Sequence, residues 1–286
     1  MAVQWRRLPA AALLLAAALS CASPPAEGEG VTSPRAGGAG VASPRAGGEG
    51  VASPRAGGAG AGASPGDRTV VVLTFDDGLA GQLTAAAMLR RHGLPATFFV
   101  SSAKLGLPGR LTRAQVRALA ADGHEIGGHT LSHARLDTLT PARQRTEICA
   151  DRRALAGLAP APVTLAYPYG RADAATARLA RECGYVAARG SGGLTPAAPR
   201  AATGLFDVPT MPAVVETTTA AALRSYVTAA ERHGGVVTLV FHDVCSSCGE
   251  YSVAPDVLDD FLGWLAARRP YGTRVRTFAE AVRAGR

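Results

Sequence analysis

The stretch VVVLTFDDG, residues 70–78, runs from a continuous apolar segment directly into two adjacent carboxylates. A short apolar run bounded by a turn is typical of a strand that is buried on both faces. Downstream, similar runs alternate with longer segments of helical spacing that are rich in Ala, Leu and Arg, which is the pattern of βα units. The expected strands are residues 70–75, 97–100, 125–128, 163–167, 186–189, 236–241 and 274–277. The expected helices are residues 81–92, 112–121, 141–155, 173–183, 218–232 and 255–268. Together these elements predict an α/β barrel of seven parallel strands.

The whole chain has 286 residues, of which 47% are hydrophobic, and this suffices for one large globular domain or two small ones. Its formal net charge is +8. Part of that excess lies ahead of the expected domain, in Arg6, Arg7, Arg35, Arg45 and Arg55. The charge therefore gives little support to nucleic-acid binding, and no nucleic-acid partner is expected.

The first 21 residues have the composition of a secretory signal peptide. Residues 1–7 are positively charged, residues 8–19 are rich in Ala and Leu, and small residues surround Ser20 and Cys21. The apolar part is shorter than the ~20 residues that a membrane-spanning helix needs, so cleavage and export are expected. Residues 18–21 also approximate the lipobox of bacterial lipoproteins, which leaves two outcomes open: ordinary cleavage after Ser20, or a lipid anchor on Cys21 at the cell surface.

Residues 22–68 contain a ten-residue repeat in three copies, which start at Val31, Val41 and Val51. Gly, Pro, Ser and Ala cannot bury enough surface to offset the entropy of the chain, so a disordered linker is expected. It would serve as a tether for a domain at residues 69–286, or be a repeat without a selected role.

Asp76 and Asp77 follow the first expected strand and precede Gly78. Two neighbouring carboxylates in a partly buried site would repel each other, so a cation is expected to relieve them. A solvated Asp-Asp-Gly turn is the alternative.

His129 and His133 follow the third expected strand and lie four residues apart. On a helical turn this spacing places both imidazoles on one face, where they can close on one metal ion. One carboxylate and two imidazoles leave coordination positions open for water and substrate, as a catalytic site requires, and free the other Asp to act as a base. Two surface or capping histidines are the alternative.

Two further expected strands end in residues suited to catalysis. Tyr167 and Tyr169 flank Pro168 after the fourth strand, where aromatic rings would suit a sugar, although such a turn is often only structural. His242 follows the run at 236–241, and a histidine at a strand end beside a metal site is a candidate general acid.

These four segments, in this order, resemble the motifs of the polysaccharide deacetylase family, also called NodB-homology or carbohydrate esterase family 4 proteins. The resemblance covers residues 70–278. It implies a distorted (β/α) barrel of about seven strands, a NodB-like fold, with a divalent metal that is commonly zinc and for which cobalt is an option. By resemblance Asp76 is the base, His242 is the acid, and the backbone N–H of Tyr169 stabilises the oxyanion. The implied metal ligands are Asp77, His129 and His133.

The resemblance further implies removal of N-acetyl groups from an N-acetylated glycan, which could be peptidoglycan, a chitin-like polymer or an exopolysaccharide. A non-catalytic carbohydrate-binding relative and an amidase that acts on a non-sugar acyl amide remain alternatives. Two family features are missing. The third motif reads Leu165-Ala166 where many relatives have an Arg that pairs with the base. In addition, no Asp-Trp pair is present, whose Asp would orient the acid histidine. Asp207 is a candidate for the second role.

Four cysteines would lie in the exported domain. Cys245 and Cys248 are expected to form a loop disulfide, in preference to a redox pair or half of a zinc site. Whether Cys149 and Cys183 pair is left open.

Overall fold

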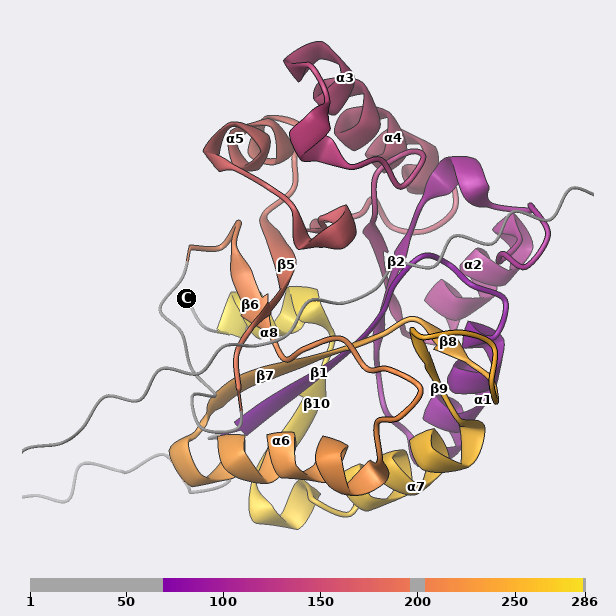
Figure 1. Ribbon diagram of the computed structural model, residues 1–286, viewed down its shortest axis with the longest axis vertical. Helices are drawn as coiled ribbons and strands as arrows, with labels where there is room; N and C mark the ends of the chain where they lie inside the picture. Colours follow the sequence, from indigo (N-terminus) through magenta and orange to yellow (C-terminus); the bar gives the residue numbers. More distant parts are fainter. Residues whose placement is uncertain (1–68, 196–203, 285–286) are drawn as a thin grey trace, which may run out of the picture. The chain divides into compact units, whose positions relative to one another are not determined.

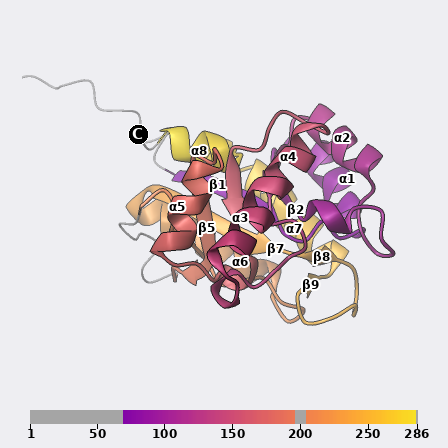
Figure 2. The same ribbon diagram turned by 90° about the horizontal axis from the view of Figure 1, so that it is seen from above.

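The computed structural model describes residues 69–195 and 204–284, and these residues form an α/β domain (Figures 1 and 2). The signal peptide and linker expected over residues 1–68 lie outside the described residues, so the proposed domain limits stay predictions. Among the described helices, none is both long enough and apolar enough to cross a lipid bilayer.

Seven parallel strands follow one another around the domain in the order β6-β5-β4-β3-β2-β1-β7. They are β1 (Thr69–Phe75), β2 (Thr97–Val100), β3 (Glu125–Gly128), β4 (Thr164–Ala166), β5 (Ala187–Gly193), β6 (Val208–Thr210) and β7 (Gly235–Phe241). Just after β6, the backbone N–H groups of Met211 and Val214 donate to carbonyls of β7 at 2.9 and 2.8 Å. These bonds bring the two ends of the sheet together, so the barrel is nearly closed.

The distorted seven-stranded barrel is confirmed, but one of its strands differs from those expected. The missed strand, β6, is only three residues long and contains Pro209, so it gave no apolar run. The segment expected as the seventh strand forms β10 (Thr273–Arg276), which pairs with the first half of β1. On the same edge of β1, the second half pairs with β2. β10 therefore fills a gap in the barrel wall rather than continuing around it.

Helices surround the strands in both views (Figures 1 and 2). They are α1 (Gln82–His92), α2 (Arg113–Ala121), α3 (Pro141–Arg145), α4 (Asp151–Ala156), α5 (Ala174–Glu182), α6 (Ala220–His233), α7 (Pro255–Ala266) and α8 (Phe278–Ala284). Side chains of Thr112, Asp173 and Thr219 cap the starts of α2, α5 and α6. The single helix expected at 141–155 is α3 and α4 joined by one π-helical segment, Thr146–Ala150, and α8 was not expected.

Strand β1 shows how the core is divided. Val71, Leu73 and Phe75 point outward into the main apolar layer beneath the helices, whereas Val72 lies inside the barrel with Phe99 and Phe278. The N-terminus of α8 is fixed at the start of the strands, where the backbone N–H groups of Phe278 and Ala279 donate to side chains of β2 and β3. The amino-terminal end of the barrel is thus plugged, and the carboxyl-terminal end is left for a site.

Candidate functional site

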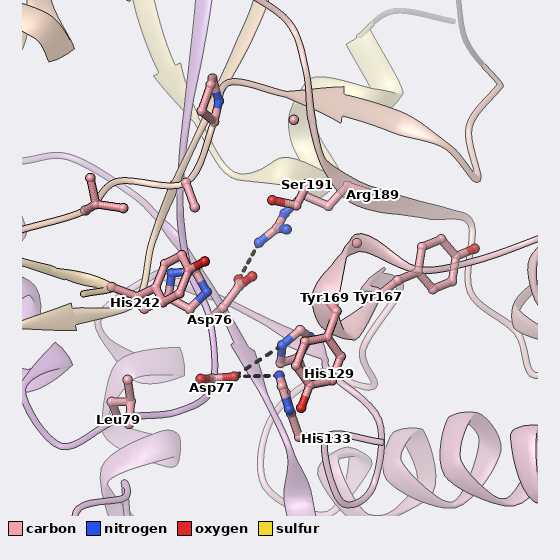
Figure 3. A pocket seen from close by; sticks show the side chains of 16 residues that line it. Asp76, Asp77, Leu79, His129, His133, Tyr167, Tyr169, Arg189, Ser191 and His242 are labelled. Atoms are coloured by element: carbon pink, nitrogen blue, oxygen red, sulfur yellow. Dashed lines mark hydrogen bonds and ion pairs between the residues drawn. The ribbon is translucent and has the colours of Figure 1, made fainter. Parts of the chain in front are cut away.

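A cavity of about 640 Å³ opens at the carboxyl-terminal ends of the strands (Figure 3). Its size lies within the range of small-ligand sites. It is lined by residues that follow β1, β3, β4, β6 and β7, by residues of β5, and by Tyr251. Every site residue expected from the sequence lines it: Asp76, Asp77, His129, His133, Tyr167, Tyr169 and His242.

Asp77 faces the two histidines of the expected metal site (Figure 3). Its Oδ1 atom is 3.0 Å from Nε2 of His133 and 3.4 Å from Nε2 of His129, and the three potential ligand atoms lie within 4.8 Å of one another. Nδ1 of His129 is 2.8 Å from the carbonyl oxygen of Ala166. A carbonyl can only accept, so Nδ1 carries a proton, and Nε2 faces Asp77, where it donates a hydrogen bond in the protonated imidazole and can bind a metal ion in the neutral one. This donor set fits a divalent metal ion with one carboxylate and two imidazole ligands.

The expectation that His129 and His133 share a helical turn is wrong. The segment is a loop that contains two left-handed residues, Thr130 with a φ of 63° and His133 with a φ of 62°. Asp77 is also left-handed, with a φ of 77°. Such backbone conformations cost free energy in non-glycine residues and persist only where the surroundings enforce them. The imidazoles therefore meet through an enforced loop and not through helical periodicity.

Asp151, at the start of α4, is one group that enforces this loop. Its carboxylate is fully buried and accepts hydrogen bonds from the backbone N–H of His129 at 3.0 Å and from that of Ser102 at 2.9 Å. Burial raises the pKa of Asp151 to about 7. A second carboxylate, on Glu147, accepts from the backbone N–H and the hydroxyl of Ser132, both at 2.9 Å. Neither role can be predicted from a motif, because both carboxylates lie on the segment after the histidine loop and act through backbone N–H groups.

The electrostatics of the cluster follow from close contact in a buried place. Burial alone would raise the pKa of Asp77, but hydrogen bonds to His129 and His133 and their positive charges outweigh it and hold that pKa well below its usual range. Burial would lower the pKa of His129, yet the hydrogen bond to Asp77 and the charges of Asp76 and Asp77 raise it. Asp77 is therefore stabilised in its ionised form, which is the form of a carboxylate that binds a metal ion.

Asp76 has a different partner, Arg189 of β5 (Figure 3). The guanidinium forms an ion pair with the Asp76 carboxylate, donates to Oγ1 of Thr74 at 3.1 Å and stacks over the ring of Phe99 at 4.6 Å. Arg189 is only 1% exposed. It fills the role of the arginine that is missing from the third motif, but from the neighbouring strand. A charged residue at the end of an otherwise apolar strand was the signal in the sequence that could have found it.

His242 lies on the opposite side of Asp76 from Arg189 (Figure 3). Within the described residues its Nδ1 atom is buried and has no hydrogen-bond partner. Burial lowers the pKa of His242, although the charges of Asp76 and Asp77 oppose the shift. The suggestion that Asp207 orients this imidazole is therefore wrong. Asp207 lies beside Gly190 instead. Burial raises the pKa of Tyr167, and the negative charge of Asp207 raises it further.

Tyr169 closes one wall of the cavity. It adopts a left-handed conformation with a φ of 59°, its side chain is 63% exposed, and its ring meets that of His133 edge-on at 4.8 Å. The turn around it is tight, because a Cβ on Gly170 would come within 2.7 Å of the backbone nitrogen of Ser191.

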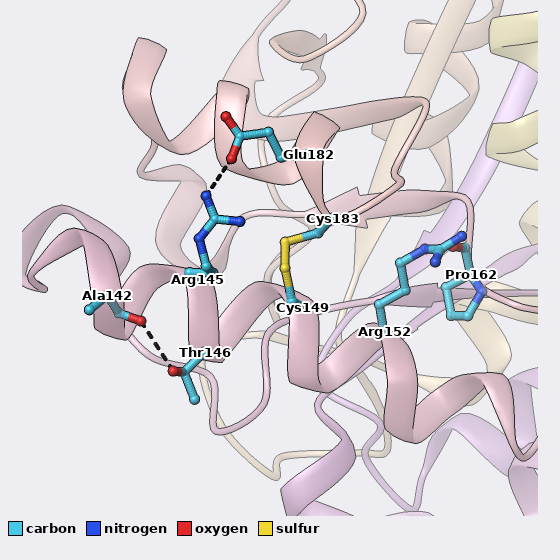
Figure 4. Close-up of a disulfide and its surroundings, with 8 residues drawn as sticks. All are labelled: Ala142, Arg145, Thr146, Cys149, Arg152, Pro162, Glu182 and Cys183. Atoms are coloured by element: carbon cyan, nitrogen blue, oxygen red, sulfur yellow. Dashed lines mark hydrogen bonds and ion pairs between the residues drawn. A yellow bond between two sulfur atoms is a disulfide. The ribbon is translucent and has the colours of Figure 1, made fainter.

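Both cysteine pairs form disulfides. Cys245 and Cys248 are linked, which confirms the expected loop disulfide. Cys149 and Cys183, whose pairing the sequence alone does not decide, are linked across 34 residues and join the π-helical segment to the end of α5 (Figure 4). In Figure 4 an ion pair between Arg145 and Glu182 lies beside this disulfide.

Residues 63–188 match the family model of polysaccharide deacetylases. A chitooligosaccharide deacetylase of Bradyrhizobium sp. is 35% identical over 104 residues, which are 35% of this chain and 46% of that protein. A peptidoglycan-N-acetylglucosamine deacetylase of Bacillus cereus is 34% identical over 111 residues, which are 38% of this chain and 39% of that protein. The chain thus spans less than half the length of these curated relatives.

Among solved structures, a family 4 acetyl xylan esterase of Clostridium thermocellum in complex with a cobalt ion is similar in fold. The TM-score is 0.53 at 22% identity, and the match covers 75% of this chain and 91% of that chain. At this identity the likeness supports the barrel architecture alone. Residues 63–188 of this chain thus match the polysaccharide deacetylase family in sequence, and the described domain shares the barrel fold of a solved family 4 esterase.

Proposed function

We propose that this chain is a divalent-metal-dependent hydrolase that removes N-acetyl groups from an N-acetylated glycan. The proposal is carried by one observation. Around a single cavity, one carboxylate faces two imidazole nitrogens, while the adjacent carboxylate and a third imidazole remain outside that cluster. The match of residues 63–188 to the polysaccharide deacetylase family model supports the reaction class.

Asp77, His129 and His133 would hold the metal, for which zinc suits the donor set and cobalt is the second choice. A bound ion supplies a Lewis acid that lowers the pKa of water and polarises the acetamide carbonyl. Three protein ligands leave room for both water and substrate.

The remaining residues would move protons and orient groups. Asp76, held by Arg189, accepts a proton from the attacking water, whose oxygen forms a bond to the acetamide carbon. The backbone N–H of Tyr169 donates a hydrogen bond to the carbonyl oxygen as negative charge develops there. His242 donates a proton to the nitrogen as the carbon–nitrogen bond breaks, and the products are acetate and a free amino sugar.

Two other functions are weighed against this one. A glycan-binding relative without turnover would have little need for both a base and an acid beside the metal ligands, and Arg189 restores the partner of the base that the third motif lacks. An amidase that acts on a non-sugar acyl amide would use the same chemistry, so only substrates separate it from a deacetylase of glycans.

The test is acetate release by the purified domain from acetylated chito-oligosaccharides, peptidoglycan, an acetylated exopolysaccharide and a small non-sugar acetamide. We expect release from at least one glycan, loss of release with a chelator, and recovery with added zinc or cobalt. Full activity in a metal-free sample would refute the metal-dependent scheme, and activity on the non-sugar acetamide alone would favour the amidase.

We further propose that the chain is exported and that Cys21 carries a lipid anchor. The leader composition supports export, and the two disulfides suit an oxidising compartment. Changing Cys21 to Ser should release the protein from the membrane fraction. If the unaltered protein is already entirely in the soluble secreted fraction, the anchor is wrong and ordinary cleavage after Ser20 remains.

A further inference from the structure

Tyr251 lies at the cavity but has no place in the chemistry described above. Its side chain is 50% exposed, it lines the cavity, and its ring centroid is 5.2 Å from that of His242. An aromatic ring that is half exposed gains little from core packing. Its position beside the candidate acid therefore requires another explanation.

The segment that carries Tyr251 is firmly built. It lies between β8 (Asp243–Val244) and β9 (Ser252–Val253), which pair with each other directly after His242. The carbonyl oxygen of Tyr251 accepts a hydrogen bond from the backbone N–H of Asp243 at 3.2 Å. Further backbone bonds and the Cys245–Cys248 disulfide hold the rest of the segment, including a bond from the N–H of Glu216 to the carbonyl of Glu250 at 2.9 Å.

The underside of this segment is fixed as well. A Cβ on Gly81, at the start of α1, would approach Oδ1 of Asp243 to 2.1 Å, so α1 packs tightly against β8. The Asp243 carboxylate also accepts from the backbone N–H of Val244 at 2.9 Å. Tyr251 is therefore presented at the cavity by a preorganised support, which keeps the entropy cost of ligand binding low.

The geometry of the reaction locates what Tyr251 would touch. In an N-acetylated sugar the leaving nitrogen is bonded directly to the pyranose ring. If His242 protonates that nitrogen, the ring must lie on the His242 side of the cavity, while the acetyl group lies on the side of Asp77 and Tyr169. The ring next to His242 on that side is Tyr251.

We propose that Tyr251 is a substrate-positioning residue that stacks on the pyranose ring bearing the leaving amine. This inference rests on the function proposed above. The C–H face of a sugar ring is apolar and suits an aromatic face, and Tyr loses little conformational entropy when it is held in place. A contact made equally in the ground state and in the transition state affects KM more than kcat.

The test compares Tyr251→Ala and Tyr251→Phe with the wild-type domain on an acetylated chito-oligosaccharide. Tyr271→Ala is the matched control, because Tyr271 is 68% exposed and does not line the cavity. We expect Tyr251→Ala to raise KM by about threefold to tenfold with kcat within about twofold, and the other two variants to behave like wild type. An unchanged KM would overturn the inference. A fall in kcat with a shifted pH profile and constant KM would also overturn it, because Tyr251 would then act by orienting His242.

A binding measurement separates this inference from the proposed function. Titration of zinc-loaded protein with the same oligosaccharide should give weaker binding for Tyr251→Ala than for Tyr251→Phe, even if the wild type shows no turnover. Absence of turnover on every acetylated glycan of the panel described above would refute the deacetylase. Equal binding by both variants, or no binding by the wild type, would refute the role of Tyr251.

Discussion

The two ends of the barrel satisfy their buried polar atoms to different degrees. At the amino-terminal end, the Glu125 carboxylate accepts hydrogen bonds from Oγ1 of Thr97 at 2.9 Å, from the Thr164 hydroxyl, and from the N–H of Ala279 at 2.8 Å. At the carboxyl-terminal end, Nε of Arg189 and Nδ1 of His242 are both buried without hydrogen-bond partners among the described residues.

Backbone strain follows the same division. The described non-glycine residues with positive φ are Asp77, Thr130, His133, Tyr169 and Ser247. Four of them line or adjoin the proposed metal site, and the fifth lies in the disulfide-linked segment after His242. One end of the barrel therefore satisfies its polar groups internally and contributes stability, whereas the other keeps strained and unsatisfied groups that a metal ion and a substrate can use.

The largest effect on activity is expected from a histidine at the carboxyl-terminal end. His242→Ala should lower the rate of acetate release by about 10²–10⁴-fold, because the leaving amine loses its proton donor. Metal content and the unfolding midpoint should stay close to wild type, since His242 is not a proposed ligand and its Nδ1 has no partner to lose.

The matched variant at the other end is His124→Ala. Nδ1 of His124 accepts a hydrogen bond from the backbone N–H of Ala96 at 3.2 Å, and its ring contacts Phe98 edge-on. This variant should lower the unfolding midpoint and leave kcat unchanged. If the two variants lost activity equally at equal stability, the division between the two ends would fail.

Arg189 should affect both properties. Arg189→Met leaves the Asp76 carboxylate buried without its counter-ion, which is expected to cost about 3 kcal/mol of unfolding free energy in the metal-free protein. It should also lower the rate by about 10²-fold, because the base loses its fixed position. Added zinc should restore part of the stability. Arg90→Met is the control: Arg90 pairs with Asp122 at the surface and should contribute well under about 1 kcal/mol.

Glu125 tests the amino-terminal end in a graded way. Glu125→Ala removes the acceptor for three donors and should cost about 2–3 kcal/mol of unfolding free energy with kcat retained. Glu125→Gln should cost less, because the Thr164 hydroxyl can rotate and accept from the new amide. Chemical denaturation of both variants, with kcat measured on the folded protein, checks the order; a loss of kcat in Glu125→Gln would contradict it.

The smallest expected effect is a pH dependence at the same end. Burial lowers the pKa of His124, so as the pH falls the unfolded chain takes up a proton before the native protein does. The stability that this group contributes is therefore fully present above its ordinary value of 6.5 and declines as the pH falls below it. His124→Asn keeps an acceptor for Ala96 but does not titrate, so the difference in unfolding free energy between wild type and variant should change over that range. A difference that is constant with pH would contradict this account.

The sequence predicted the barrel and the site residues by two different routes. Apolar runs such as residues 70–75 and 236–241 correspond closely to β1 and β7, because buried parallel strands must be apolar on both faces. Strand β6 was not predicted, because a strand of three residues that includes Pro209 is too short to show a pattern of apolar side chains. The groups that support the site, Arg189 and Asp151, were also missed. Their partners Asp76 and His129 lie 113 and 22 residues away in sequence, and only the closure of the barrel brings them together.

For His129 and His133, the prediction that the two imidazoles are neighbours is correct, but the reason given for it is wrong. The spacing of His129 and His133 was interpreted as a helical turn, but the chain there is a loop held by Asp151 and Glu147. A four-residue spacing thus pointed to two neighbouring imidazoles without specifying the backbone that joins them.

The central claim is the division of labour between two adjacent carboxylates, with Asp77 a metal ligand and Asp76 a base held by Arg189. The most direct test measures zinc content and acetate release on Asp76→Asn and Asp77→Asn, with His129→Ala as the reference for a lost ligand. We predict that Asp76→Asn keeps its zinc and loses turnover, while Asp77→Asn and His129→Ala lose both. Loss of zinc in Asp76→Asn together with full zinc in Asp77→Asn would contradict the account, because the two residues would then have the opposite roles.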